Sequence, residues 1–155
     1  MNVEVNNESG IDVDARGLMQ LSRFVMSALR MHPECELSIK LVDEVTMARY
    51  HLEFLDLPGP TDVMSWPMDE LRPGAEDADG SDQTLGHLGD IALCPSVAAE
   101  QGAKAGHGTW AEMELLTVHG ILHLLGYDHA EAGEKAEMWD VQSRLLEAWR
   151  APDRE

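Results

Sequence analysis

Apolar and polar residues alternate in several short stretches of the chain, as they do in half-buried β-strands. Within residues 36–43, for example, Leu37, Ile39 and Leu41 are separated by polar residues. Because successive side chains of a strand point to opposite faces, such alternation predicts strands with one face in the core. Four strands are predicted in this way: Asn2–Asn6, Glu36–Asp43, Thr61–Pro67 and Leu88–Leu93.

Other stretches space their apolar residues as one side of an α-helix does. The first begins after Asp14, a predicted N-cap, places Leu18, Leu21 and Val25 on one side, and ends before Pro33. Thr109-x-x-Glu112 is a capping-box pattern that predicts the start of another helix. The four later helices are expected from Asp43 to about Phe54, Pro95 to Ala105, Thr109 to Leu125 and Ala132 to Trp149.

The order of these elements is βαβαββααα, which indicates an α+β fold with a four-stranded mixed sheet and about five helices. With 155 residues, 44% of them hydrophobic, the chain is expected to form one domain over residues 1–155. The segment Asp69–Thr84 is rich in acidic residues, and we expect a mobile loop or flap there.

Charge and composition narrow the classes of function. The 29 acidic and 11 basic residues give a net charge of −18, which repels a phosphate backbone and disfavours a non-specific nucleic-acid binder. Cys35 and Cys94 are far apart and are expected to be buried thiols in a reducing compartment. The sequence shows neither a secretory signal nor a membrane span, so we expect a cytoplasmic protein with no membrane partner.

Three histidines carry the most specific chemical signal, in the pattern H-x3-H-x5-H. His119 and His123 are four residues apart, so on a helix their side chains lie on one side, about 6 Å apart along the axis. Gly126 favours the positive φ that ends a helix and turns the chain, which could bring His129 to the same point. Three imidazoles leave a bound dication one open position for water, the arrangement of a hydrolytic metal site.

A His-x-x-x-His pair on a helix is more often a surface feature than a metal site, and the third histidine is what favours metal binding here. The other four histidines, His32, His51, His87 and His107, are expected to be surface or capping residues. Metzincin proteases, whose zincin fold carries a metal-binding helix, have the same histidine and glycine offsets in H-E-x-x-H-x-x-G-x-x-H. Their general-base glutamate corresponds to Gly120 here, which disfavours a proteolytic mechanism.

With glycine in that place, residues 119–129 resemble the hallmark H-G-x-L-H-L-x-G-Y-D-H of the YbeY family of metal-dependent endoribonucleases. Residues 60–67, PTDVMSWP, are similar to that family's P-T-D-V-L-S-F-P. Residues 88–91, LGDI, match its L-G-D-I, and the blocks occur in the same order. The resemblance covers nearly the whole chain.

The resemblance implies a single-strand-specific endoribonuclease that acts in 16S rRNA 3′-end maturation and late-stage ribosome quality control. It implies one Zn²⁺ per chain, held by His119, His123 and His129, although three histidines also suit Ni²⁺. The implied partners are ribosomal RNA and small-subunit ribosomal proteins or assembly factors. Because the chain is so acidic, we expect such a protein partner to bring it to RNA.

The chain departs from the family at one point. Family members commonly carry an arginine shortly before the P-T-D-V block, proposed to contact RNA phosphate, and residues 50–59 contain none. Arg49 is therefore the candidate for an RNA contact. Its ordinary alternative is a solvated residue on a helix.

Asp62 and Asp90 are candidates to orient a metal-binding histidine or to accept a proton, although each could equally be a turn or cap residue. For Asp128 we expect helix capping, and Trp66 is a candidate for stacking on a base.

Two alternatives to a metallo-endoribonuclease follow from the same residues. One is a non-catalytic ribosome-assembly factor in which the metal only braces the fold. The other is a metalloprotease, which Gly120 disfavours.

Overall fold

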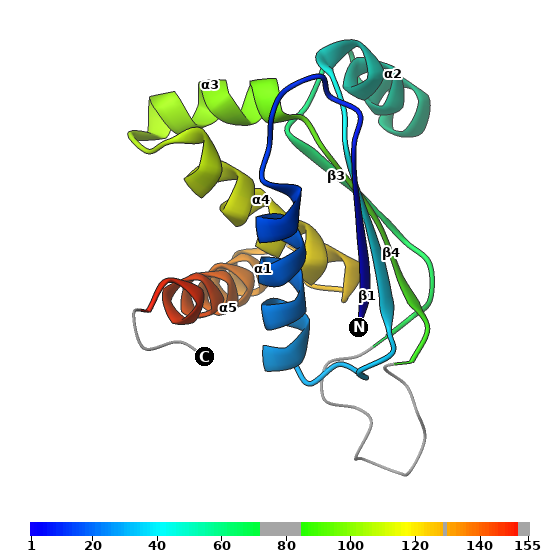
Figure 1. Ribbon diagram of the computed structural model, residues 1–155, viewed down its shortest axis with the longest axis vertical. Coiled ribbons are helices and arrows are strands. Elements are labelled where there is room, and N and C mark those ends of the chain that lie inside the picture. Colours follow the sequence, from blue (N-terminus) through cyan, green and yellow to red (C-terminus); the bar gives the residue numbers. More distant parts are fainter. Residues whose placement is uncertain (72–84, 129, 152–155) are drawn as a thin grey trace.

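The computed structural model describes residues 1–71, 85–128 and 130–151 and has an α+β fold, as predicted (Figure 1). Four strands form one sheet in the order β1-β2-β4-β3. Neighbours β1/β2 and β2/β4 are parallel, whereas β3 and β4 are antiparallel. The strands are β1 (Asn2–Asn7), β2 (Glu36–Leu41), β3 (Val63–Pro67) and β4 (His87–Leu93).

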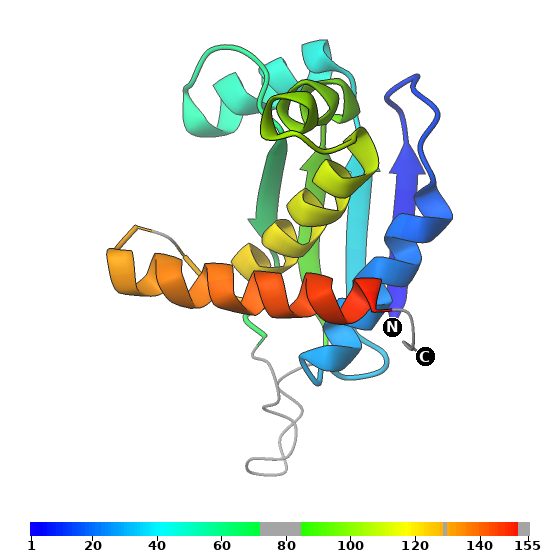
Figure 2. The same cartoon turned by 90° about the vertical axis from the view of Figure 1, so that its left-hand side faces the viewer.

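Five helices in the described ranges complete the predicted order of elements. They are α1 (Ala15–Ala28), α2 (Glu44–Leu55), α3 (Pro95–Ala105), α4 (Thr109–Leu124) and α5 (Ala132–Arg150). Helices α1 and α4 cover one face of the sheet and α5 runs across them, while α2 lies at one end of the other face (Figures 1 and 2). The predicted four-stranded mixed sheet with five helices is confirmed.

The main core lies between the sheet and helices α1, α4 and α5. Leu37, Ile39 and Leu41 of β2 are each at most 1% exposed, so the predicted alternation does point one face of this strand inward. Glu114 of α4, 5% exposed, accepts from Trp149 Nε1 at 2.8 Å and from the Arg150 guanidinium at 2.8 Å. These bonds fasten the end of α5 to α4.

Two of the predicted helix caps are present. Asp14 accepts from the Gly17 N–H at 2.9 Å, and Asp43 accepts from the Thr46 N–H at 2.8 Å. The bond from Thr46 holds the pKa of Asp43 below its usual value because it stabilises the carboxylate.

The capping box predicted at Thr109 is wrong. The N-cap of α4 is Gly108, without a side-chain hydrogen bond, and Thr109 is already helical. Glu112, which the motif would turn back toward the helix start, instead contacts His107 Nε2 at 2.6 Å. The N-cap position of α5 belongs to Glu131, and the capping role expected for Asp128 stays a prediction.

Most of the predicted acidic loop, residues 72–84, lies outside the described residues. Its first part is described, and there Leu71 is 5% exposed within the main core. Cys35 and Cys94 are buried free thiols, and burial raises the pKa of Cys35 to about 11. Among the described helices, none is both long and apolar enough to cross a membrane.

Candidate metal centre and active site

Helix α4 lies close to the sheet at Gly120. A Cβ atom there would stand 3.0 Å from Ile91 Cδ1 and 3.3 Å from Ser65 Oγ. The Ser65 hydroxyl donates to the Gly120 carbonyl at 3.4 Å, so Ser65 joins β3 to the helix. A glutamate, the general base of metzincins at this offset, has no space between helix and strands.

His119 and His123 lie together on another side of α4, where both are partly buried. Their ring centroids are 4.6 Å apart and the rings are nearly perpendicular, at 79°. His119 Nδ1 lies 3.0 Å from Gln142 Oε1 on α5. An amide oxygen can only accept a hydrogen bond, so with the Gln142 oxygen facing the ring this contact favours the tautomer with the proton on Nδ1 and the lone pair on Nε2, the atom that a metal would use.

Gln142 is a functional candidate that the motifs did not reveal. It is only 5% exposed and lies on α5 between the buried residues Met138 and Leu145. A buried amide requires a partner, and the His119 ring provides one. The signal available in the sequence was a polar residue within the apolar stripe of a helix.

Gly126 ends α4 as predicted. Its φ is 95°, its N–H donates to the His123 carbonyl at 3.0 Å, and the Tyr127 N–H donates to the Leu122 carbonyl at 3.0 Å. These two bonds form a Schellman motif, which reverses the chain direction. His129 lies outside the described residues, and the described part of the chain by itself contains no group of three metal-binding side chains.

A hollow of about 410 Å³ adjoins the histidine pair. His123 lines it on the side of α4, and the chain that leaves β3 lines the other side, from Pro67 to Leu71. Trp139 of α5, 40% exposed, lies with its ring centroid 5.5 Å from that of His119. His123 is thus reached from this hollow, and His119 lies beside His123 and Trp139.

The side chain of Asp62 contacts its neighbours in sequence and Gln101 of α3, which links it to the first turn of α4 and not to the histidine pair. Its Oδ1 accepts from the Val63 N–H at 2.8 Å. With its amide nitrogen facing the two carboxylates, Gln101 donates to Asp62 Oδ2 at 2.8 Å and to Glu112 Oε2 at 3.2 Å. Seven residues separate Glu112 from His119, about 10 Å along the helix.

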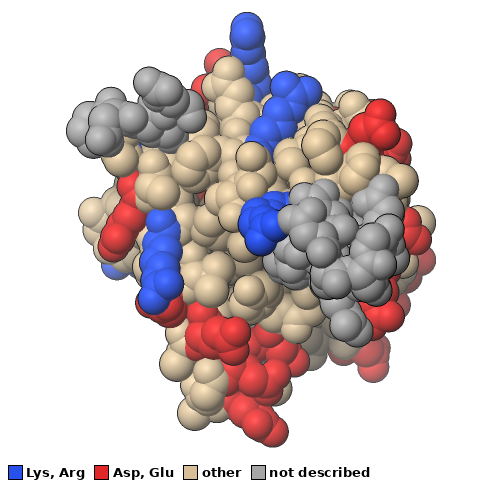
Figure 3. Space-filling view, turned by 90° about the horizontal axis from the view of Figure 1, so that it is seen from below, with Lys and Arg blue, Asp and Glu red and all other residues tan. Residues whose placement is uncertain are grey.

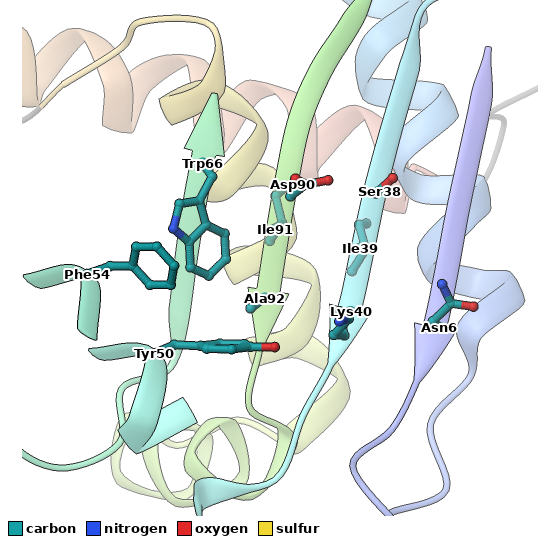
Figure 4. A pocket seen from close by; sticks show the side chains of 10 residues that line it. All are labelled: Asn6, Ser38, Ile39, Lys40, Tyr50, Phe54, Trp66, Asp90, Ile91 and Ala92. Carbon is teal, nitrogen blue, oxygen red and sulfur yellow. The ribbon is translucent and has the colours of Figure 1, made fainter. Parts of the chain in front are cut away.

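Asp90 points away from α4. Gly89 and Ile91, its neighbours on β4, face Leu124 and Gly120 of the helix, so strand alternation turns Asp90 to the other face of the sheet. There it lines a groove with Trp66, and its Oδ1 lies 3.4 Å from His87 Nε2 (Figure 4). The structure therefore does not bring Asp90 to the histidine pair.

Arg49 and Trp66 lie on α2 and β3, and both adjoin Tyr50 of α2. The Arg49 guanidinium is 5.7 Å from the Tyr50 ring centroid. The ring centroid of Trp66 lies 5.6 Å from that of Tyr50, with the two rings nearly perpendicular, and 5.3 Å from that of Phe54 (Figure 4). An RNA contact by either residue remains a prediction.

The other four histidines have polar partners outside the histidine pair. His32 Nδ1 accepts from the Glu34 N–H, His51 Nδ1 pairs with the Gly59 carbonyl, His87 Nε2 with the Gly89 carbonyl, and His107 Nε2 with Glu112 Oε1. These local bonds fit the surface and capping roles expected for them.

Comparisons with known proteins agree with the family resemblance of the sequence motifs. The family model described as Endoribonuclease YbeY matches residues 3–150. A relative named Endoribonuclease YbeY from a Nocardioides species is 58% identical, over 97% of this chain and 99% of its own. Another of that name from Acidothermus cellulolyticus is 57% identical, over 99% of this chain and 94% of its own.

The fold is also similar to a solved structure. The solution structure of TM1509 from Thermotoga maritima matches with a TM-score of 0.63 and 22% identity, over 99% of each chain. At that identity the likeness supports the fold alone. The family match and the two close relatives show that this chain belongs to the endoribonuclease YbeY family.

Proposed function

We propose that this protein is a metal-dependent endoribonuclease that cleaves single-stranded RNA in the cytoplasm, in 16S rRNA 3′-end maturation and late-stage ribosome quality control. The observation that carries this proposal is the His119–His123 pair, with His123 lining a cleft and Gln142 next to His119, in a chain of the endoribonuclease YbeY family.

The donor set fits a divalent metal of the zinc type. Two neutral imidazoles on one side of α4 supply two nitrogen ligands, and we propose His129, after the turn at Gly126, as the third. Ni²⁺ suits the same ligands. A bound Zn²⁺ polarises a phosphoryl oxygen and lowers the pKa of its water ligand to about 7.

The chain's own residues hold and orient the reacting groups. Gln142 fixes the tautomer of His119 and keeps the direction of its ring. The cleft beside His123 accepts the RNA strand, and Trp139 borders the histidine pair from α5. Because Gly120 leaves no room for a glutamate next to the histidines, the site lacks the metzincin base and peptide hydrolysis is disfavoured.

The net charge of −18 supports a need for a protein partner at the RNA. Small-subunit ribosomal proteins or assembly factors are the partners proposed. A partner that supplies positive charge near the cleft would offset the repulsion between this acidic chain and a phosphate backbone. The isolated protein is then expected to cleave RNA slowly, and its cleavage rate is expected to depend strongly on the salt concentration.

The test is cleavage of a single-stranded RNA that spans a precursor 16S rRNA 3′ end, with the same sequence in a duplex for comparison. The native chain, loaded with Zn²⁺ or Ni²⁺, is expected to cut the single strand, and a chelator is expected to stop it. His119→Ala should lower both the bound metal per chain, measured by mass spectrometry, and the cleavage rate to background.

The matched control is His51→Ala, which removes a histidine that bonds only the Gly59 carbonyl among the contacts described for it. It should keep both metal and cleavage. If His119→Ala folds and cuts RNA as fast as the native chain, the metal site is not the catalytic one. If the metal-loaded native chain never cuts, and metal loss merely melts it, the non-catalytic assembly factor is the better description.

A further inference from the structure

The solvent-facing side of α1 is basic in an otherwise acidic chain. Residues 15–33 form the longest stretch of the sequence without an Asp or Glu, and they contain three arginines seven residues apart: Arg16, Arg23 and Arg30. A spacing of seven returns to the same side of a helix after two turns. Arg16 and Arg23 lie on the exposed side of α1, and Arg30, which is also exposed, follows the end of this helix at Ala28.

Two of these arginines border one surface hollow. A hollow of about 700 Å³ is lined by Arg23, Ser27 and Arg30 together with Met1, Met31 and Pro33. A second hollow, on the other side of Arg23, is lined by Glu4 and Glu36 among others. Arg23 and Arg30 thus border one hollow together with the hydroxyl-bearing side chain of Ser27.

The underside of the molecule carries side chains of both charges, with acidic ones also along its right edge (Figure 3). In Figure 3, acidic side chains gather in the lower part of this face, whereas several basic side chains lie toward its top and centre. Local segregation of this kind lets an acidic protein present a limited anion-binding area.

The backbone of Arg30 gives an independent reason to assign it a function. Its φ is 59°, in the left-handed region where non-glycine residues are rare. Its N–H donates to the Ser27 carbonyl and the Met31 N–H donates to the Met26 carbonyl, so Arg30 occupies the position of a Schellman motif that usually holds glycine. An arginine thus occupies a backbone conformation that favours glycine. This points to a role for the Arg30 side chain.

We propose that Arg23 and Arg30, with Ser27 between them, bind phosphates of a single-stranded RNA substrate. This inference rests on the proposed function, because it takes the RNA to be the strand cut at the histidine pair. Helices α1 and α4 lie on the same face of the sheet, and α5 runs across both (Figure 2). Guanidinium groups suit phosphate because they donate two parallel hydrogen bonds.

The experiment measures RNA binding without cleavage. Fluorescence anisotropy of a labelled single-stranded RNA, with chelator present, gives Kd for the full chain over a series of salt concentrations. The double variant Arg23→Gln, Arg30→Gln should bind on the order of tenfold more weakly at low salt. It should also reduce the slope of log Kd against log salt by about 1.4, because each lost phosphate contact removes about 0.7 on a single strand.

The matched control removes the same charge elsewhere, with Lys104→Gln on α3 and Arg144→Gln on α5. Arg144 pairs with Asp140 at 3.0 Å and is not part of the basic side of α1. This double variant should keep the native slope. If both double variants lower the slope equally, the effect is one of net charge and the proposed surface is wrong.

A single substitution separates binding from folding. Arg30→Gly removes the guanidinium but suits the left-handed backbone, so it should weaken RNA binding while Tm stays the same or rises. Native affinity and slope in Arg30→Gly and in the Arg23, Arg30 double variant would overturn the proposal. The proposal is also overturned if this surface binds an acidic, phosphate-free protein segment in place of RNA.

The two proposals fail in different ways. If the metal-loaded native chain never cleaves RNA yet binds it with the predicted dependence on Arg23 and Arg30, the proposed function fails and the surface stands. If the double variant binds and cleaves RNA as the native chain does, the surface fails and the metal site stands.

Discussion

Helices α1 and α4 end with the same pair of hydrogen bonds, but different residues occupy the left-handed position after each helix. Arg30 follows α1 with φ 59°, and Gly126 follows α4 with φ 95°. In each case that residue donates to the carbonyl three residues earlier, and the next residue donates five residues back. The two helix ends have the same backbone hydrogen bonds, so they differ only in the side chain at the left-handed position.

The difference shows what each helix end does beyond stopping the helix. Glycine at 126 adopts the left-handed conformation without strain and turns the chain toward His129. Arginine at 30 adopts it at a cost of about 1 kcal/mol, and the chain retains a cation there. Termination alone explains Gly126, whereas it does not explain Arg30. The following predictions test this contrast, beginning with the α4 side.

The largest effect is expected from Gln142, the residue that orients His119 beside the end of α4. Gln142→Leu should lower the affinity for Zn²⁺ about 10- to 100-fold, because the His119 ring loses the acceptor that fixes its tautomer. Gln142→Glu keeps an acceptor and should restore tight binding. Competition with a chromogenic chelator measures the affinity, and ¹⁵N shifts of His119 in the metal-free chain report the tautomer.

A merely structural role for Gln142 makes a different prediction. In that case Gln142→Leu would change Tm but leave the His119 ¹⁵N shifts and the Zn²⁺ affinity at their native values. That result would remove Gln142 from the site.

A smaller effect is expected at the glycine itself. Gly126→Ala should lower the free energy of unfolding by about 1 kcal/mol, because alanine is strained at a φ of 95°. Metal affinity should fall with it, since the turn leads to His129. Chemical denaturation measures the stability.

The matched control is Gly133→Ala in the first turn of α5, where an added Cβ meets nothing within 4 Å. That variant should be as stable as the native chain or more so by about 0.5–1 kcal/mol. Equal losses in the two variants would mean that the backbone angle at Gly126 is not what matters.

The smallest effect, and one of opposite sign, is expected at the end of α1. Arg30→Gly relieves about 1 kcal/mol of backbone strain but loses about 0.3–1 kcal/mol from a cation near a helix C-terminus. The net result should be a stabilisation of roughly 0.5 kcal/mol, visible as a slightly higher Tm. A clear loss of stability would show that Arg30 is present for the helix and not for a ligand.

Much of the fold and part of the site were predictable because their causes are local. The order of strands and helices follows from the period of the apolar residues, and the caps at Asp14 and Asp43 bond N–H groups three residues away. The histidine pair also follows from spacing on one helix. Gly126 needed only its own lack of a side chain.

The errors and omissions arose where a distant element competes for the same group. Glu112 fits a capping box by spacing, but His107 and Gln101 from the preceding segment take its carboxylate. Asp90 is part of the family block L-G-D-I, yet the alternation of side chains along β4 turns it to the face of the sheet away from α4. Gln142 lacks a motif because its partner is 23 residues away on another helix.

The sequence alone therefore determined the elements, the spacing of His119 and His123, the excess of acid and the acid-free run that holds Arg23 and Arg30. Tertiary structure decided which polar groups meet: Gln142 with His119, Asp62 with Gln101, and Gly120 with the sheet. The physical reason is that periodicity and capping act within a few residues, whereas a buried hydrogen bond or a close helix–sheet approach depends on how whole elements pack.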